Sequence, residues 1–139
     1  MPDDVLLNKV SIIERCVARV RAVYAGDSAR LHDHLTLQDS ILLNLQRACE
    51  AAIDLAMHLV STRRLGIPQE SREAFDLLRA AGLLSPELCD AMRRMVGFRN
   101  VAVHDYRKLD LAIVQSILDR HLDDFLAFAR AAIALSATP

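Results

Sequence analysis

The sequence has no tryptophan, and aromatic residues of all kinds make up only 4% of its 139 positions. Glycine and proline are also scarce, at 4 each, so the chain has few residues suited to the turns that join many short strands. Hydrophobic residues nevertheless reach 53%, and a core built mainly from aliphatic side chains is typical of helix bundles. These scarcities favour long helices over a β-sheet fold.

Cysteine is rare and odd in number, with Cys16, Cys49 and Cys89 widely spaced within apolar patterns. This arrangement predicts buried thiols in a reducing compartment and excludes a disulfide framework. The sequence starts Met-Pro-Asp-Asp, without the basic residues and apolar run of a signal peptide, and no apolar segment approaches the roughly 18 residues of a membrane span. We therefore expect a cytoplasmic protein with no membrane partner.

The formal net charge of -1 excludes a globally basic nucleic-acid-binding protein. Cations are nevertheless concentrated between residues 93 and 108, where Asp105 is the one acid. A local basic surface is therefore expected, in which the pair Arg93-Arg94 either steers a nucleic acid or belongs to a solvated face. The cations of this stretch are Arg93, Arg94, Arg99, Arg107 and Lys108.

Apolar periodicity and helix-end signals together predict an all-α, antiparallel bundle of four or five helices. Gly66 and Pro68 end one helix, Ser85 and Pro86 begin another as N-cap and first residue, and Asp110 caps the last. We expect residues 1–139 to form a single domain, with 136–139 frayed. The predicted helices cover about 3–25, 37–64, 71–81, 86–106 and 111–135, and 27–36 is expected to be a polar connection.

The predicted helix from Pro86 to Tyr106 sorts its side chains into two neighbouring stripes. One stripe begins as an apolar seam and then carries Arg99 and Tyr106, where apolar residues are expected. Burying such groups is costly unless they face a cleft or an interface. The other stripe is almost wholly polar, with Asn100 and His104 one turn apart, and Gly97 leaves room for a ligand or another chain to approach the backbone.

These polar groups have a catalytic interpretation and a purely structural one. Arg99 and His104 lie roughly 140° apart around the helix axis, so the arginine must reach round, or the helix must bend, for both to contact one phosphate. Arg99 would then hold the phosphate oxygens while His104 moves a proton. Alternatively, Arg99 bridges to an acid of a neighbouring helix, His104 is solvated and Tyr106 closes the bundle end.

Other histidines give a weak signal for a metal. His32 and His34 lie in a connection and Asp54 and His58 on a helix, without the fixed spacing of a four-ligand site, and His121 lies near an apolar face. We therefore predict no metal and no cofactor.

The run from Arg99 to Tyr106 resembles the Rx4HxY signature of the HEPN superfamily, and specifically that of HepT-like toxins paired with a minimal nucleotidyltransferase antitoxin. The likeness extends over about 35–106 and includes the Gly66-Ile67-Pro68 break and the Ser-Pro start of the motif helix. Within the long preceding helix it includes Gln46, Arg47, Glu50, Ile53, Asp54, Ala56 and His58.

The resemblance implies a HEPN-like bundle that acts as a metal-independent ribonuclease toxin of a type VII-like pair and cleaves RNA such as tRNA or mRNA. It implies Arg99 and His104 as catalytic residues, helped by Asn100. It further implies that the partner nucleotidyltransferase silences the toxin by transferring AMP to Tyr106. The cations that we expect to contact RNA are Arg93, Arg94, Arg107 and Lys108.

One motif histidine per chain is few for a reaction that needs both a proton acceptor and a proton donor. HEPN relatives pair two motif helices across a cleft, so we expect a homodimer with a composite site. The alternative is a catalytically silent bundle that serves as binding and scaffold partner of a nucleotidyltransferase.

Overall fold

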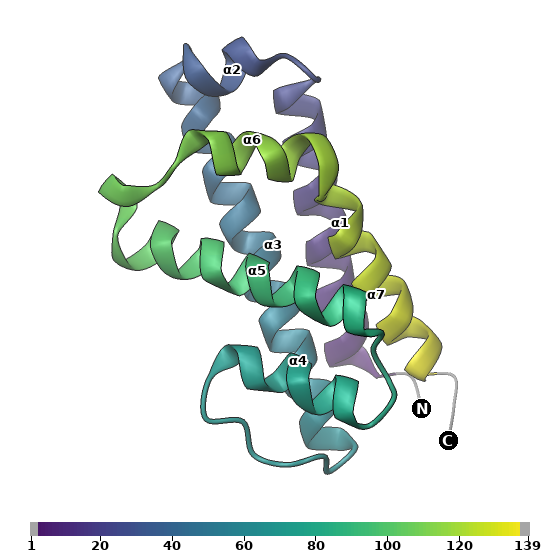
Figure 1. The fold of residues 1–139 in the computed structure, drawn as a ribbon. Coiled ribbons are helices and arrows are strands. Elements are labelled where there is room, and N and C mark those ends of the chain that lie inside the picture. Colours follow the sequence, from purple (N-terminus) through teal and green to yellow (C-terminus); the bar gives the residue numbers. More distant parts are fainter. Residues whose placement is uncertain (1–2, 137–139) are drawn as a thin grey trace.

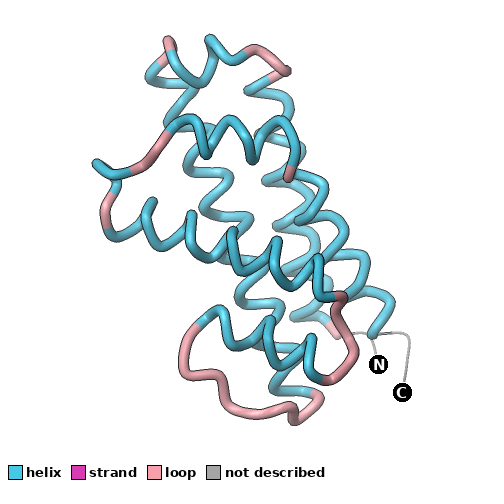
Figure 2. The backbone as a smooth tube through the Cα atoms, viewed as in Figure 1, coloured by secondary structure: helices cyan, strands magenta, loops and turns pink. Residues whose placement is uncertain are grey.

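A computed structural model describes residues 3–136 of the chain. Helices joined by loops account for this part of the chain, and no strand occurs in it (Figure 2). This confirms the all-α prediction. The helices are α1 (Asp4–Tyr24), α2 (Ser28–His32), α3 (Leu35–Thr62), α4 (Ser71–Ala80), α5 (Pro86–His104), the 3-10 turn η1 (Tyr106–Lys108), α6 (Leu111–Arg120) and α7 (Leu122–Ser136).

Three long helices lie side by side and form the body of the molecule (Figure 1). Helix α1 runs antiparallel to α3 and α7, and it packs most extensively against α3. Helix α5 lies obliquely across them, with α4 near one end of α3, while α6 contacts α1, α2 and α7. The helix that carries the motif is thus supported by α3, α4 and α7.

The core is one hydrophobic cluster to which every α-helix contributes. The apolar seams of α1 and α3, whose residues recur with the period of a helix, are buried. Alanines on α3 allow close approach of neighbouring helices, and Phe75 packs edge-on against Phe128 with ring centroids 5.3 Å apart. The buried seam residues are Leu6, Val10, Ile13, Val17, Val20 and Tyr24 on α1, and Ile41, Leu45, Ala48, Ala52, Leu55 and Leu59 on α3.

The predicted helix starts are confirmed by their side-chain caps. Ser85 Oγ accepts a hydrogen bond from the Leu88 N–H at 3.1 Å, with Pro86 as the first residue of α5. Asp110 Oδ1 likewise accepts from the Ala112 N–H at 2.8 Å and begins α6. The helix that carries the motif and the helix that follows it therefore both begin at residues that the local sequence predicts.

One additional short helix and one break in a predicted helix raise the number of helices above the expected four or five. The additional helix is α2, which lies in the predicted polar connection, is capped by Asp27 and buries Leu31 against the core. The last predicted helix is divided at His121, whose φ of -124° and ψ of 1° end α6 before α7 begins. The His121 Nδ1 atom lies 3.0 Å from Asp124 Oδ2 at this break. The spacing of apolar residues continues unchanged across this break, so the apolar periodicity of the sequence did not predict it.

Helix α5 ends at His104, two residues short of the predicted end. Asp105 adopts φ -151° and ψ 62°, and Tyr106 belongs to the η1 turn. From Val103 to Lys108 no side chain is buried, so no core contact supports a further helical turn. The expectation that Arg99 and Tyr106 share one stripe of a continuous helix is therefore wrong.

All three cysteines are buried and unpaired, as predicted. Burial raises the pKa of the Cys16, Cys49 and Cys89 thiols. At the other end of the chain, Ser136 is the last residue of α7, and the rest of the segment expected to fray lies outside the described residues. None of the helices between residues 3 and 136 combines the length and apolarity that crossing a lipid bilayer requires.

Candidate active site

Arg99 extends from α5 to two other helices and is mostly covered by them. Its Nη2 atom donates to Ser71 Oγ at 2.9 Å, and its Nη1 lies 3.5 Å from Glu50 Oε1 on α3. Only 17% of its side chain is exposed. Among the described residues, the buried Nε atom has no hydrogen-bond partner. The guanidinium is therefore held in place while retaining a donor that the protein does not use.

Arg99, Asn100 and His104 line one cavity of about 230 Å³ between the start of α4 and the last turns of α5. His104 is exposed and is the last residue of α5, whereas Asn100 is half-buried. The fold therefore brings these three residues together at one cavity. The cavity is completed by Glu70, Ser71, Arg72 and Val96.

The space beside Gly97 is occupied by Arg72 of the same chain. A Cβ atom at Gly97 would lie 2.8 Å from Arg72 Nη2, and Arg72 Nε donates to the Arg93 carbonyl at 3.3 Å. The missing side chain admits this guanidinium, so Gly97 does not offer the open approach that we expected. Arg72 adds a second cation to the cavity of Arg99, and no local pattern in the sequence marks it.

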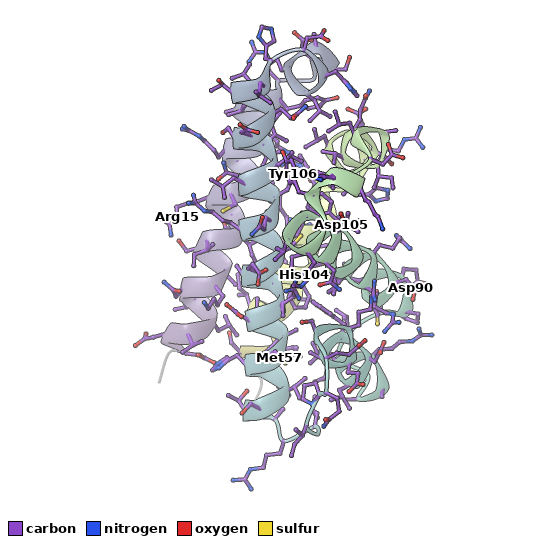
Figure 3. All side chains as sticks on the ribbon, turned by 90° about the vertical axis from the view of Figure 1, so that its left-hand side faces the viewer. Arg15, Met57, Asp90, His104, Asp105 and Tyr106 are labelled. Carbon is purple, nitrogen blue, oxygen red and sulfur yellow. The ribbon has the colours of Figure 1, made fainter. Side chains whose placement is uncertain are left out.

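Tyr106 lines a different cavity, of about 240 Å³, beside the first half of α3. Figure 3 shows Tyr106 and His104 at separate places along α3. The Tyr106 side chain is 50% exposed. Partial burial, the Asp39 charge and a hydrogen bond to Asp39 raise the pKa of its hydroxyl. The phenol is therefore accessible and protonated at neutral pH, and it lies outside the cavity of His104.

The predicted RNA-contacting cations are dispersed. Arg93 Nη1 lies 2.6 Å from Asp76 Oδ2, and Lys108 Nζ lies 3.2 Å from Asp105 Oδ2. Arg94 and Lys108 border a third cavity of about 400 Å³ between α5 and α6, and Arg107 is exposed. These side chains surround the motif helix on more than one side and do not form a single patch.

Two histidines outside the motif, His32 and His58, have hydrogen-bond partners that account for them. His32 Nε2 lies 2.8 Å from Gln115 Oε1, and His58 Nε2 lies 2.7 Å from Asp3 Oδ2. His34 precedes α3 without a side-chain cap. Within residues 3–136, no three His, Cys, Asp or Glu side chains are grouped so that they could hold a metal ion.

The chain is similar to known ribonucleases. A family profile described as "Ribonuclease HepT-like" matches residues 13–132. An mRNA nuclease HepT of Shewanella oneidensis is 48% identical over 126 residues, covering 91% of this chain and 94% of its own. A tRNA nuclease HepT of Aphanizomenon flos-aquae is 32% identical over 87 residues, covering 60% and 59%.

A solved structure has the same fold. The tri-AMPylated HEPN toxin of Shewanella oneidensis, in complex with MNT antitoxin, superposes with a TM-score of 0.90 at 46% identity. The match covers 96% of this chain and 99% of that chain.

Proposed function

The chain belongs to the HepT-like ribonuclease family, and we propose that it is the toxin of a toxin–antitoxin pair and cleaves RNA without a metal ion. The observation that carries the proposal is the shared cavity of Arg99, Asn100 and His104. Relatives named as mRNA and tRNA nucleases support RNA as the substrate. The three unpaired thiols suit the reducing cytoplasm, where we place the protein.

The proposed reaction is attack of an RNA 2′-hydroxyl on the adjacent phosphorus. The bond from phosphorus to the 5′-oxygen of the next nucleotide breaks, which leaves a 2′,3′-cyclic phosphate and a 5′-hydroxyl. His104 transfers protons at the mouth of the cavity, and the Arg99 guanidinium stabilises the negative charge that develops on the phosphate oxygens. Asn100, one turn from His104, holds the substrate through its amide. Glu50 and Ser71 fix the Arg99 guanidinium before substrate binds.

We further propose that the active form is a symmetric homodimer. One chain supplies one motif histidine, and the proposed reaction needs a proton acceptor and a proton donor. His104 is exposed at the end of α5, so the same residue of a second chain can reach the same substrate. Contacts of Arg93, Arg94, Arg107 and Lys108 with RNA stay a prediction.

We propose that the toxin is inactivated by transfer of AMP to Tyr106. A partner nucleotidyltransferase presents ATP, the Tyr106 oxygen attacks the α-phosphorus, and the bond between the α- and β-phosphates breaks to release pyrophosphate. The phenolic proton leaves to the neighbouring Asp39 carboxylate or to water. The exposed hydroxyl and the AMPylated toxin of Shewanella oneidensis support this assignment. Mass spectrometry after co-expression should find AMP on Tyr106, and a modification elsewhere would refute this.

The catalytically silent bundle is the second candidate. The ion pair between Arg99 and Glu50 favours it, since a purely structural arginine makes the same contact. Incubating the purified protein with RNA in EDTA separates the two candidates. We expect fragments that end in a 2′,3′-cyclic phosphate, and no cleavage of the same RNA carrying 2′-O-methyl groups. Intact RNA after prolonged incubation would favour the silent bundle.

A further inference from the structure

Three arginines outside the motif converge on one surface groove. Arg15 and Arg19 are one turn apart on α1, and Arg47 is on the neighbouring α3. All three side chains are exposed, and they line a cavity of about 700 Å³. The buried Cys16 lines the same groove and lies next to Arg15 in the sequence.

Among the described residues, none of these three arginines forms an ion pair with a carboxylate. Whereas Asp76 and Asp105 pair with Arg93 and Lys108, Arg15 has only a long hydrogen bond to the Ser11 carbonyl, at 3.4 Å. Among the described residues that line the groove, Asp39 is the one carboxylate, and Ser40 and Asn44 add neutral hydrogen-bonding groups. A groove with three arginines and neutral polar groups suits a chain of phosphates.

The groove adjoins the cavity of Tyr106. Asp39 and Leu43 line both this groove and the cavity of Tyr106. The Tyr106 cavity also includes Ala102 of α5, which lies within one turn of Arg99 and His104. Figure 3 shows Arg15 on one side of α3 and Tyr106 on the other. Along α3, Leu43 and Glu50 are about 10 Å apart, so a short single strand spans the distance.

We propose that Arg15, Arg19 and Arg47 bind the phosphate backbone of the RNA substrate and direct the strand past Tyr106 into the cavity of Arg99 and His104. This inference rests on the proposed ribonuclease function and adds the substrate path. It also explains how AMP on Tyr106 can silence catalytic residues in another cavity, since the nucleotide lies across the path. Its phosphate repels the phosphates of the incoming strand.

The test compares a long RNA with a tetranucleotide that spans the same cleaved bond. The triple variant Arg15→Gln, Arg19→Gln and Arg47→Gln should raise KM for the long RNA about tenfold or more and leave tetranucleotide cleavage unchanged. For 2′-O-methyl RNA, which is not cleaved, the slope of log affinity against log salt should fall by about 2, since each lost phosphate contact removes about 0.7.

A matched control replaces three exposed arginines that line none of these cavities, Arg64→Gln, Arg120→Gln and Arg130→Gln. Affinity and salt slope equal to this control would overturn the groove proposal. So would loss of tetranucleotide cleavage, or loss of antitoxin binding with RNA binding intact. If the wild type cleaves neither RNA, the ribonuclease function fails, while the affinity and salt slope still decide whether the groove binds RNA.

Discussion

Arg99 is bound to two helices other than its own, through Ser71 at the start of α4 and Glu50 on α3. These residues are 28 and 49 positions away in the sequence. The motif spacing predicted that Arg99 and His104 act together, and it gave no sign of Ser71, Glu50 or Arg72. The spacing of residue types in the sequence predicts which side chains lie close together on one helix. The contacts that those side chains make with other helices depend on how distant segments of the chain pack.

Replacing Arg99 by lysine tests whether a planar guanidinium is needed. Lysine keeps the positive charge toward Glu50 but cannot reach Ser71, Glu50 and a phosphate with one rigid fork. We expect Arg99→Lys to lower kcat by about 100-fold, as for the loss of one oriented donor to a developing oxyanion, with little change in melting temperature. Steady-state kinetics measure the change in kcat, and thermal melts measure the melting temperature. A variant with near wild-type kcat would contradict the proposed role.

Tyr106 should titrate above its ordinary pKa of 10 because partial burial and Asp39 favour the protonated phenol. Asp39→Asn removes the negative charge and should lower this pKa, whereas Asp54→Asn, farther along α3, should leave it unchanged. An absorbance titration can follow this, since the chain has 2 tyrosines and no tryptophan, and Tyr24 titrates separately, at about 12. Equal titration curves for both variants would reject the contact between Asp39 and Tyr106.

At the scale of elements, periodicity predicted the long helices and their buried seams because the core selects one face of each helix. It did not predict the end of α5 at His104 or the break at His121. The end of α5 follows from a lack of core contacts after Ala102, and the apolar period runs through His121 unchanged. The arginine groove was missed for a related reason, since Arg15 and Arg47 belong to different helices.

The contact between the end of α1 and α6 should contribute pH-dependent stability. The buried Tyr24 hydroxyl donates to Asp119 Oδ1 at 2.7 Å, and burial together with Asp119 raises its pKa to about 12. Tyr24→Phe should cost about 1 to 2 kcal/mol of unfolding free energy near pH 8. The unfolded phenol ionises near pH 10, so this wild-type advantage should shrink as the pH rises from 10 toward 12. Denaturant unfolding of both proteins at several pH values measures this difference in unfolding free energy. A difference that stays constant between pH 8 and pH 12 would contradict the hydrogen bond between Tyr24 and Asp119.

The proposed reaction requires two chains of this protein. Sedimentation equilibrium should give twice the chain mass of 15.5 kDa at concentrations where RNA is cleaved. Specific activity should fall on dilution together with the dimer fraction, because the proposed reaction draws a histidine from each chain. A monomer with undiminished specific activity would refute the composite site.

RNA cleavage in EDTA by matched histidine variants tests whether the cavity of Arg99 and His104 carries out the chemistry. His104 lines the cavity with Arg99, whereas His34 is exposed at the start of α3 and lines none of the cavities described. We predict that His104→Ala loses at least about 100-fold in cleavage rate, with an unchanged melting temperature, and that His34→Ala cleaves like the wild type. Equal cleavage by all three proteins would contradict the claim that this cavity carries out the chemistry.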